Sequence, residues 1–530
     1  MRIIFPVGLT EAEQALVKRL GKRSKFYVFM RSIRHQLFDD AMQEQLETMF
    51  SDKPRGTPPI PAAQLVLMAL LQAYDSVSDD DAIEHAIAND RWKLVLGTLG
   101  TNASPCSKKT LVFFRQRMVK HEMGDKVLAK TIALAKETKL FDPRKLGKLR
   151  VVFDSAPLRG AGRVEDTINL VGHGIKNVLI CVATVMGAGW VELAEAADVE
   201  IVRQDRSVKA ALDLDWNQPD ATDTAISRLV QEAQRLQSWL DETLPELLDE
   251  VEIAGALQLL HRLIEQDTEP KPQGGYRIKQ GVAPDRIISI SDPDMRHGRK
   301  SSSQVVKGYK RYDVCDLDSG LTLGACVLPA NVPEEAGATK MGPGLLAYGT
   351  LEEIQMDRAF LSSPFVIDAY EKGTKILSKP FPYPRTGRLD KSEFTIDLSA
   401  GTVSCPADQT ARIVNSRAKY PLKVCNACSL REQCRPPNTR NGRVILIHEH
   451  EELMQQLHAG VRDPARRQQL RERVKIEHSL AHICAQQGPR ARYRTVKMNN
   501  YDMHRYATIK NLFALKRHLD AHPEMLKLAA

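Results

Sequence analysis

The chain has 530 residues, of which 43% are hydrophobic and 27% are charged, an ordinary composition for a protein that folds around apolar cores. This length exceeds what a single core supports, so we expect several domains. There is no apolar run of about 18 residues, and the start lacks the apolar region of a signal peptide. We therefore expect no membrane partner and a cytoplasmic location.

The positive charge is concentrated in the last quarter of the chain. Residues 411–530 carry 23 Lys and Arg against 10 Asp and Glu, a net charge of +13, whereas the preceding residues sum to −4. A basic region on a near-neutral body indicates a polyanionic partner, most often nucleic acid. A solvated basic surface would give the same count.

Residues 1–145 have the pattern of a helical domain. A Pro-rich stretch at 51–61 precedes three helix candidates, at 62–74, at 79–96 and from Ser107 onward. The third is basic, as is the recognition helix of a helix-turn-helix unit; its basic residues are Lys108, Lys109, Arg115, Arg117 and Lys120. The pattern predicts either DNA contact or a plain helical bundle.

A short apolar strand at 151–153 ends on a carboxylate, Asp154. An ionised carboxylate that leaves a core is costly unless a cation receives it, which makes Asp154 a candidate metal ligand. Asp is also a common cap at strand ends and helix starts, so a simple cap is the alternative.

Residues 161–285 have the pattern of a helical insertion without a catalytic motif. After this insertion the spacing of apolar residues changes to that of strands. Segments 305–316 and 321–328 flank an Asp-Ser-Gly turn, which predicts a hairpin. Asp292 and Asp294 precede this hairpin. They have the ligand chemistry for a metal, but the Asp-Pro pair favours a turn.

A second carboxylate, Asp357, ends another predicted short strand. Ile354 and Met356 belong to this predicted strand, and a helix is expected at 360–370. Asp357 thus repeats the arrangement of Asp154.

A third carboxylate lies on a late helix that begins at Pro464 and closes at Gly488. Its predicted inner face, spaced 4, 3, 4 and 3 residues apart, consists of Leu470, Val474, Glu477, Ala481 and Cys484. A carboxylate on such a face requires a cation. Arg473 supplies one if the pair is structural; otherwise Glu477 is a metal ligand or catalytic acid.

Four of the nine cysteines lie close together in the sequence, separated by 19, 2 and 5 residues: Cys405, Cys425, Cys428 and Cys434. In a cytosolic protein such a cluster indicates a metal site before disulfides. Four thiolates satisfy tetrahedral zinc with no open position, which predicts structural zinc. Four reduced cysteines without metal are the alternative.

Residues 488–519 interleave Arg and Lys with Tyr and His, a combination that suits contacts with phosphates and bases. The apolar side chains within this segment predict a core-facing stripe; they are Ile509, Leu512, Phe513 and Leu515.

Several motifs in this order resemble those of the DDE transposases of bacterial insertion sequences. FDSAPLRGAGRVEDTINLVGHG resembles the first-Asp motif, and SDPDMRHGRKSSSQVVKGYK followed by VLPANVPE resembles the second and third core strands. CNACSLREQC is similar to the cysteine-rich insertion and RERVKIEHSLAHI to the Glu helix. Residues 60–120 are similar to the N-terminal helical domain of that group.

The resemblance implies an α/β fold with an RNase H-like mixed-sheet catalytic core. The implied parts are an N-terminal helical domain for DNA binding and dimerisation at 1–145, core segments at 146–160, 286–380 and 456–530, a helical insertion at 161–285 and a small Cys-rich β insertion at 381–455. The Glu lies in the last core segment.

The resemblance also implies that Asp154, Asp357 and Glu477 bind Mg²⁺ or Mn²⁺ for two-metal phosphoryl transfer, with Arg473 near the phosphate. The implied activity is cleavage and transfer of double-stranded DNA at terminal inverted repeats, by a homodimer. The chain departs from relatives in lacking a Gly-Tyr pair after Asp357 and in having Leu470 where related groups have Tyr. The alternatives are a DNA-binding protein without catalysis and an RNase H-like nuclease that cuts without joining.

Overall fold

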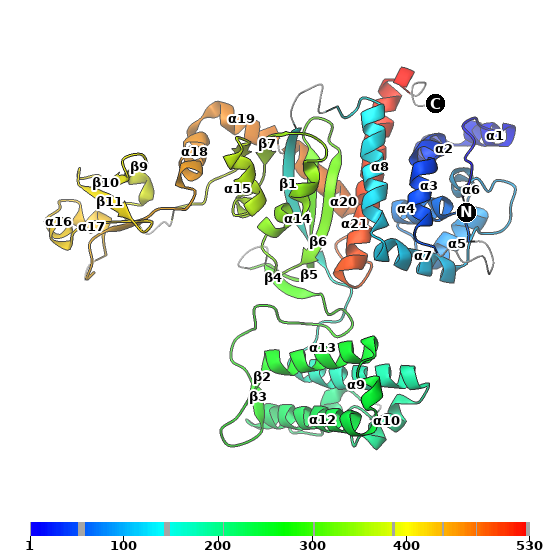
Figure 1. Cartoon of the computed structure of the whole chain (residues 1–530), viewed down its shortest axis with the longest axis horizontal. Helices are drawn as coiled ribbons and strands as arrows, with labels where there is room; N and C mark the ends of the chain where they lie inside the picture. The colour runs from blue at the N-terminus through cyan, green and yellow to red at the C-terminus, as the bar shows by residue number, and fades with distance from the viewer. Residues whose placement is uncertain are drawn as a thin grey trace.

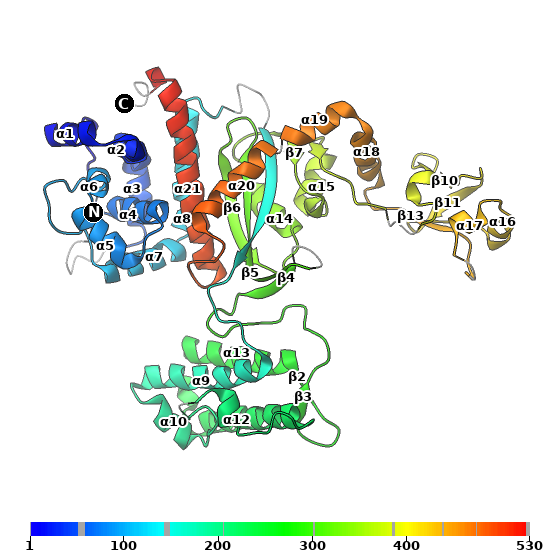
Figure 2. The same ribbon diagram turned by 180° about the vertical axis from the view of Figure 1, so that it is seen from behind.

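The computed structural model describes residues 2–50, 59–142, 149–204, 206–299, 303–383, 387–436, 439–472 and 474–525. For residues 462 and 474–479 it describes the backbone but not the side chains. A mixed sheet lies at the centre, with the N-terminal helices on one side and a small β module projecting from the other (Figure 1). A helical insertion extends from the end of the sheet, and the view from behind shows the same three attachments (Figure 2).

The N-terminal helices are α1 (Glu11–Arg19), α2 (Lys25–Leu37), α3 (Asp40–Glu47), α4 (Ala62–Asp75), α5 (Asp79–Ala88), α6 (Asp90–Leu96), α7 (Lys108–Lys120) and α8 (Met123–Glu137). Ser107 caps the start of α7, which confirms the helix predicted from Ser107 onward. The single helix expected at 79–96 is wrong, because Asn89 ends α5 and its side chain accepts a hydrogen bond from the N–H of Arg91 to start α6.

The central sheet consists of β1 (Leu149–Arg159), β4 (Arg296–Arg299), β5 (Val305–Asp316), β6 (Thr322–Pro329), β7 (Leu351–Gln355) and β8 (Lys375–Leu377). β5 pairs antiparallel with β1 along one edge and with β4 and β6 along the other. β7 is parallel to β1, and β8 is parallel to β7. The predicted hairpin is confirmed as β5 and β6.

Strand β1 does not end at Asp154 as expected. It pairs with β5 as far as Arg159, so Asp154 lies in the middle of a long strand. β7 pairs with β1 only up to Val152, and the next backbone pairing on β1 apart from β5, among the described residues, is at Arg159, which exchanges hydrogen bonds with Pro489 and Ala491. Pro157 falls between these two pairings, where a missing N–H does not break a central ladder.

Helices cover both faces of this sheet. One face carries α14 (Glu335–Leu345) and α15 (Pro364–Glu371), and the other carries α20 (Val474–Gln487) and α21 (Val496–Ala521) (Figures 1 and 2). α21 packs against β6 and also against α4 and α8. The sheet and the N-terminal helices consequently share one apolar core.

The insertion has an apolar core of its own. It consists of α9 (Thr167–Met186), α10 (Trp190–Ala196), α11 (Val208–Ala211), α12 (Ala221–Thr243), α13 (Val251–Asp267) and a hairpin of β2 (Thr268–Pro270) and β3 (Tyr276–Ile278). By length and composition alone, α9 would suffice to cross a membrane. Its apolar face is buried by α12 and α13, as in the core helix of a folded unit.

The β module has five antiparallel strands in the order β13–β12–β11–β10–β9. They are β9 (Thr395–Asp397), β10 (Thr402–Ser404), β11 (Thr410–Val414), β12 (Arg417–Lys419) and β13 (Val444–Leu446), with short helices α16 (Leu422–Asn426) and α17 (Arg431–Cys434). Helices α18 (Glu451–Arg462) and α19 (Pro464–Glu472) lead back to α20.

Candidate active site

The register of two parallel strands brings Asp154 and Asp357 to neighbouring positions. Val152 of β1 pairs with Gln355 of β7, and each aspartate lies two residues beyond its paired residue. Asp357 keeps an extended backbone, with φ −76° and ψ 156°. Because adjacent strands lie about 4.8 Å apart, the two aspartates occupy adjacent places where β1 and β7 separate.

Both aspartates also make local backbone contacts. Oδ1 of the half-buried Asp154 accepts a hydrogen bond of 2.9 Å from the N–H of Ser155, and Oδ1 of the exposed Asp357 accepts one of 3.0 Å from the N–H of Arg358. Asp357 caps the 3-10 turn that follows it, whereas Asp154 lies within β1 and caps no described turn or helix, so the simple-cap alternative for Asp154 is wrong.

The third predicted acid, Glu477, lies on α20, which packs against β1. Its side chain, like the whole of Arg473, lies outside the described residues. The predicted inner face of the helix needs a correction, because Ala481 is exposed whereas Leu480 and Ile483 are buried. The buried line of α20, which packs against β1 and α21, therefore lies one position earlier than predicted.

A carboxylate that sequence reasoning missed lies opposite Asp154. Asp313 of β5 pairs directly with Asp154 of β1 and is almost fully buried. Nζ of Lys510 on α21 lies 3.3 Å from Oδ2 of Asp313 and 2.9 Å from Sγ of Cys315. Burial opposes the charge of Lys510, but the Asp313 carboxylate and the Cys315 thiol raise its pKa above the ordinary value.

The only sequence signal for Asp313 was the alternation of β5. Arg311, Asp313 and Cys315 are every second residue, so they share one face, which is the face covered by α20 and α21. Polar residues on one face of an otherwise apolar strand indicate a polar environment there.

A second missed network surrounds Arg150, which precedes the apolar part of β1. Its guanidinium lies 3.2 Å from Oε1 of Glu353 on β7 and 2.9 Å from Oε2 of Glu472, the last residue of α19. Asp318 in the β5–β6 turn lies 3.1 Å away. Arg150 thus ties the chain that leads into α20 to the two strands that carry the aspartates.

Within the described side chains no group of three or more His, Cys, Asp or Glu has metal-binding geometry. The Glu477 side chain is not among them. The backbone at 293–294 forms the predicted turn, and the two acids hold the start of α21: Asp292 accepts hydrogen bonds from Tyr309 and the N–H of Thr495, and Asp294 accepts one from the N–H of Val496.

The four clustered cysteines come together in the β module. All are half-buried thiols that line one cavity of about 30 Å³: Cys405, Cys425, Cys428 and Cys434. The N–H of Leu430 points at Sγ of Cys428 (3.4 Å), and the N–H of Arg443 points at Sγ of Cys425 (3.5 Å). Burial raises the pKa of the Cys434 thiol. The thiols share a cavity without the mutual geometry of a formed metal centre.

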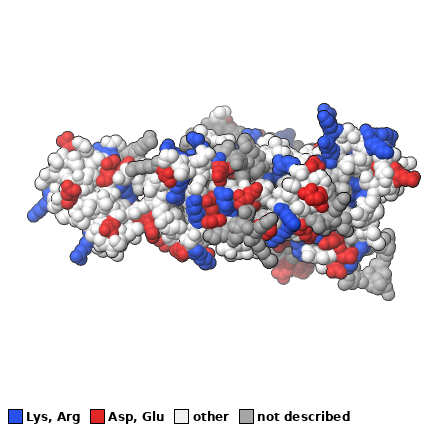
Figure 3. All heavy atoms as spheres, turned by 90° about the horizontal axis from the view of Figure 1, so that it is seen from above, with Lys and Arg blue, Asp and Glu red and all other residues white. Residues whose placement is uncertain are grey.

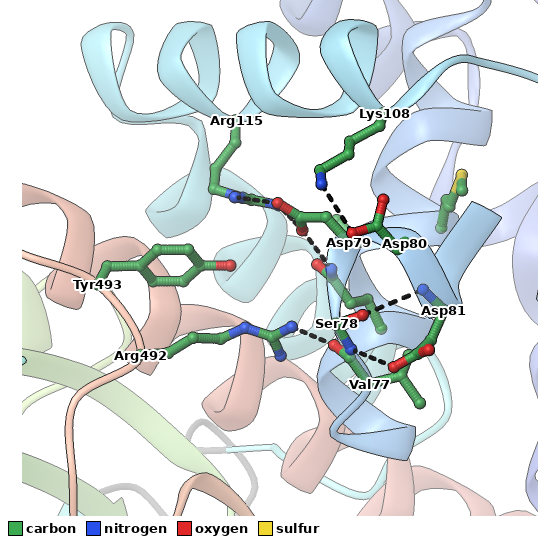
Figure 4. A network of polar contacts seen from close by, with 12 residues as sticks. Val77, Ser78, Asp79, Asp80, Asp81, Lys108, Arg115, Arg492 and Tyr493 are labelled. Atoms are coloured by element: carbon green, nitrogen blue, oxygen red, sulfur yellow. Dashed lines mark hydrogen bonds and ion pairs between the residues drawn. The ribbon is translucent and has the colours of Figure 1, made fainter.

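One basic side chain of α7, Arg115, is used inside the protein (Figure 4), whereas Lys108, Lys109, Arg117 and Lys120 are exposed. Arg115 is buried and its Nη2 lies 2.5 Å from Oδ1 of Asp79, while Lys108 pairs with Asp80. The guanidinium of Arg115 also lies over the ring of Tyr493, 4.8 Å from its centroid. For Arg115 the expectation of DNA contact is therefore wrong, and α7 instead anchors the loop before α21.

The basic and aromatic segment 488–519 is interior only in part, because Arg490, Arg494, Lys497 and Arg517 are exposed. Tyr501, Arg505 and Tyr506 are buried on α21, and Arg505 pairs with the buried Asp502. Phosphate contact by these side chains is excluded by their burial, whereas the core stripe through Ile509, Leu512 and Leu515 is confirmed. On the face seen in Figure 3, basic and acidic side chains are interspersed.

Comparison with known families gives two matches. A family described as a transposase domain (DUF772) matches residues 17–117, and one described as a transposase DDE domain matches residues 400–515. The resemblance to the DDE transposases is confirmed. No curated protein and no solved structure matches the chain.

The two transposase domains lie at opposite ends of the chain. The N-terminal match covers α2 to most of α7, and the C-terminal match covers the cysteines, Arg473 and Glu477. Asp154 and Asp357 lie between the two matched regions. These domains support a transposase function with DNA as the partner.

Proposed function

We propose that this transposase binds the terminal inverted repeats of an insertion sequence and catalyses DNA strand cleavage and transfer, with Asp154, Asp357 and Glu477 as its catalytic carboxylates. The observation that carries the proposal is the register of β1 and β7, in which Val152 pairs with Gln355 two residues before each aspartate. The packing of α20 against β1 supports the third position. By resemblance, Arg473 acts near the phosphate.

The order of the strands supports an RNase H-like core. Three antiparallel strands, β6, β5 and β1, are followed by β7 and β8 in parallel with β1. We propose that the three carboxylates are Asp154 in β1, Asp357 just after β7 and Glu477 on α20.

The proposed ligand set is chemically suited to Mg²⁺ or Mn²⁺. Three carboxylates are hard oxygen donors, which these ions prefer to nitrogen or sulfur. When bound, a pair of such ions supplies charge stabilisation to the attacking and leaving oxygens of a phosphoryl transfer. In this chain, Asp154 and Asp357 fix two of the ligand positions on strands rather than on mobile loops.

We further propose that the four cysteines hold a structural zinc ion, which the two N–H groups aimed at Cys425 and Cys428 would support from outside the ligand set. The test is metal analysis of the purified chain. About one zinc per chain is expected, falling in Cys428→Ser; a chain free of zinc that folds normally would leave the cysteines as reduced thiols.

The test of the main proposal uses a DNA duplex ending in the inverted repeat that flanks the gene, with Mg²⁺ and a target plasmid. The intact protein is expected to cut the repeat end and join it to the target. Asp154→Asn and Glu477→Gln are expected to bind the duplex without cutting it. Asp368→Asn, an exposed acid on α15, is the matched control and should remain active.

Other outcomes would identify the other functions. Cleavage without joining would assign an RNase H-like nuclease, and binding without cleavage under any divalent metal would assign a non-catalytic DNA-binding protein. Unchanged cleavage in Asp154→Asn would remove the carboxylate assignment. A homodimer on the repeat DNA, in the cytoplasm, is part of the proposal, and sedimentation of the complex tests the stoichiometry.

A further inference from the structure

The β module has one sheet face that nothing in the described chain covers. On β11, β12 and β13 alternate residues point inward, where Ala411, Ala418 and Ile445 are buried. The outward residues of the three strands are all exposed: Arg412, Val414, Arg417, Lys419, Val444 and Leu446. We call these six residues the outer face.

The outer face carries three positive charges and no negative charge. β11, β12 and β13 contain no Asp or Glu. Within the described residues, Arg412, Arg417 and Lys419 form no ion pair, although many other surface cations do, such as Lys108 with Asp80. Pairing of Ile413 with Ala418 and of Val414 with Arg417 brings the three cations onto neighbouring strands. Like charges on one sheet face destabilise it unless an anion is present.

The outer face is concave and includes a tight turn. Arg412, Val414, Asn415, Arg417 and Lys419 line a hollow of about 550 Å³. The turn between β11 and β12 has two residues with positive φ, Asn415 at 49° and Ser416 at 56°. That is the tight hairpin turn whose twist matches the strands, so the cations are held on a preformed hairpin.

We propose that the outer face binds the sugar–phosphate backbone of double-stranded DNA, as a contact surface separate from the carboxylate face. Phosphates neutralise the three unpaired cations, and the apolar side chains Val414 and Leu446 pack on sugars. A protein partner fits less well, because charged residues are depleted from the cores of protein interfaces and the outer face has no aromatic side chain and no Met. The module projects from the central sheet (Figure 1), so it reaches DNA beyond the segment held at the carboxylates.

This inference rests on the proposed function, since it takes DNA as the substrate. The test compares the full-length protein with the triple variant Arg412→Gln/Arg417→Gln/Lys419→Gln on a fluorescein-labelled duplex of mixed sequence, over a series of salt concentrations. Each lost phosphate contact lowers the slope of log affinity against log salt by about 0.9, so three contacts lower it by about 2.7. The affinity at low salt is expected to fall at least tenfold.

Two controls separate the inference from misfolding and from a general charge effect. Neutralising like charges should leave the thermal midpoint of the triple variant unchanged or higher, whereas damage to the module would lower it. Lys423→Gln removes a cation from α16 in the same module but off the outer face, and it should change neither slope nor affinity.

The outcomes are distinguishable from failure of the proposed function. If the intact protein binds no duplex DNA, the proposed function itself fails. If the intact protein binds and the triple variant keeps the same affinity and slope, only the outer-face assignment is overturned. Loss of self-association in the triple variant with unchanged DNA affinity would assign the face to a second copy of the chain instead.

Discussion

Asp154 and Asp313 lie directly opposite each other on β1 and β5, so two carboxylates face the same side of the sheet at neighbouring positions. Like charges placed opposite each other across strands are unfavourable. Lys510 offsets this repulsion from α21, with Nζ 3.3 Å from Asp313 and 2.7 Å from Oγ1 of Thr322. The last long helix therefore supplies the positive charge that pairs with the carboxylate facing Asp154.

Lys510→Met is expected to destabilise the protein strongly. The Asp313 side chain is 2% exposed and Lys510 only 12%, and removing one partner of a buried ion pair costs about 3–5 kcal/mol because the other charge stays buried. The measurement is the urea unfolding midpoint of the full chain. The matched control on the same helix is Lys516→Met, whose partner Asp520 is 62% exposed, with an expected loss below about 1 kcal/mol.

The sequence predicted the parts of this site that depend on local signals. The β5–β6 hairpin followed from alternation and a turn, and Asp154 and Asp357 were each connected with a strand. Their proximity was not predictable, because the pairing of Val152 with Gln355 joins residues 203 positions apart, and no local pattern fixes such a register. Asp313 was missed for the same reason.

The composition of two basic segments led to wrong predictions, because composition does not indicate which side chains are buried. The mixture of Arg, Tyr and His after Gly488 suggested phosphate contacts, yet Arg505 is 3% exposed and bonded to Asp502. Arg115 on α7 likewise forms an ion pair with Asp79. A cation that has a carboxylate partner elsewhere in the chain looks, in sequence, the same as one that is free to bind DNA.

The pair of Asp79 and Arg115 predicts an acid-sensitive junction between α5 and α7. Burial alone would raise the pKa of Asp79, but hydrogen bonds from Arg115 and Gln72 hold it below the ordinary value. A lowered folded pKa stabilises the protein at pH above the unfolded value of about 3.9, and this contribution disappears as the pH falls through the folded pKa. The stabilisation is therefore complete at neutral pH and lost in strong acid.

Asp79→Asn should therefore cost about 1–3 kcal/mol at pH 7 and make stability less dependent on pH below about 4. Unfolding in urea at a series of pH values measures both effects. Asp80→Asn is the control, because its pair with Lys108 is 69% and 54% exposed and should contribute little. Equal losses for the two variants would contradict the buried-pair explanation.

Gly298, in the motif that resembles the second core strand, is required for close packing. It pairs with Val306 of β5, and a Cβ at this position would lie 2.0 Å from the backbone oxygen of Ala330. Gly298→Ala is expected to cost at least about 1–3 kcal/mol, because backbone rather than a flexible side chain must move. Thermal unfolding checks this loss. Gly255→Ala, in α13 with open space around it, should instead stabilise by about 0.5–1 kcal/mol.

Arg150→Met is expected to reduce strand cleavage more than DNA binding. Arg150 holds Glu472, at the end of α19, against Glu353 of β7, so its loss loosens the approach to α20 while leaving the β11–β13 surface intact. Glu353 is 6% exposed and keeps Lys375 as a partner, which limits the expected loss of stability to about 1–3 kcal/mol. Cleavage at saturating DNA is the measurement. Asp318→Asn removes only the turn contact of Arg150 and should cleave normally. Normal cleavage by Arg150→Met, with the expected loss of stability, would show that Arg150 supports the fold but does not position α20.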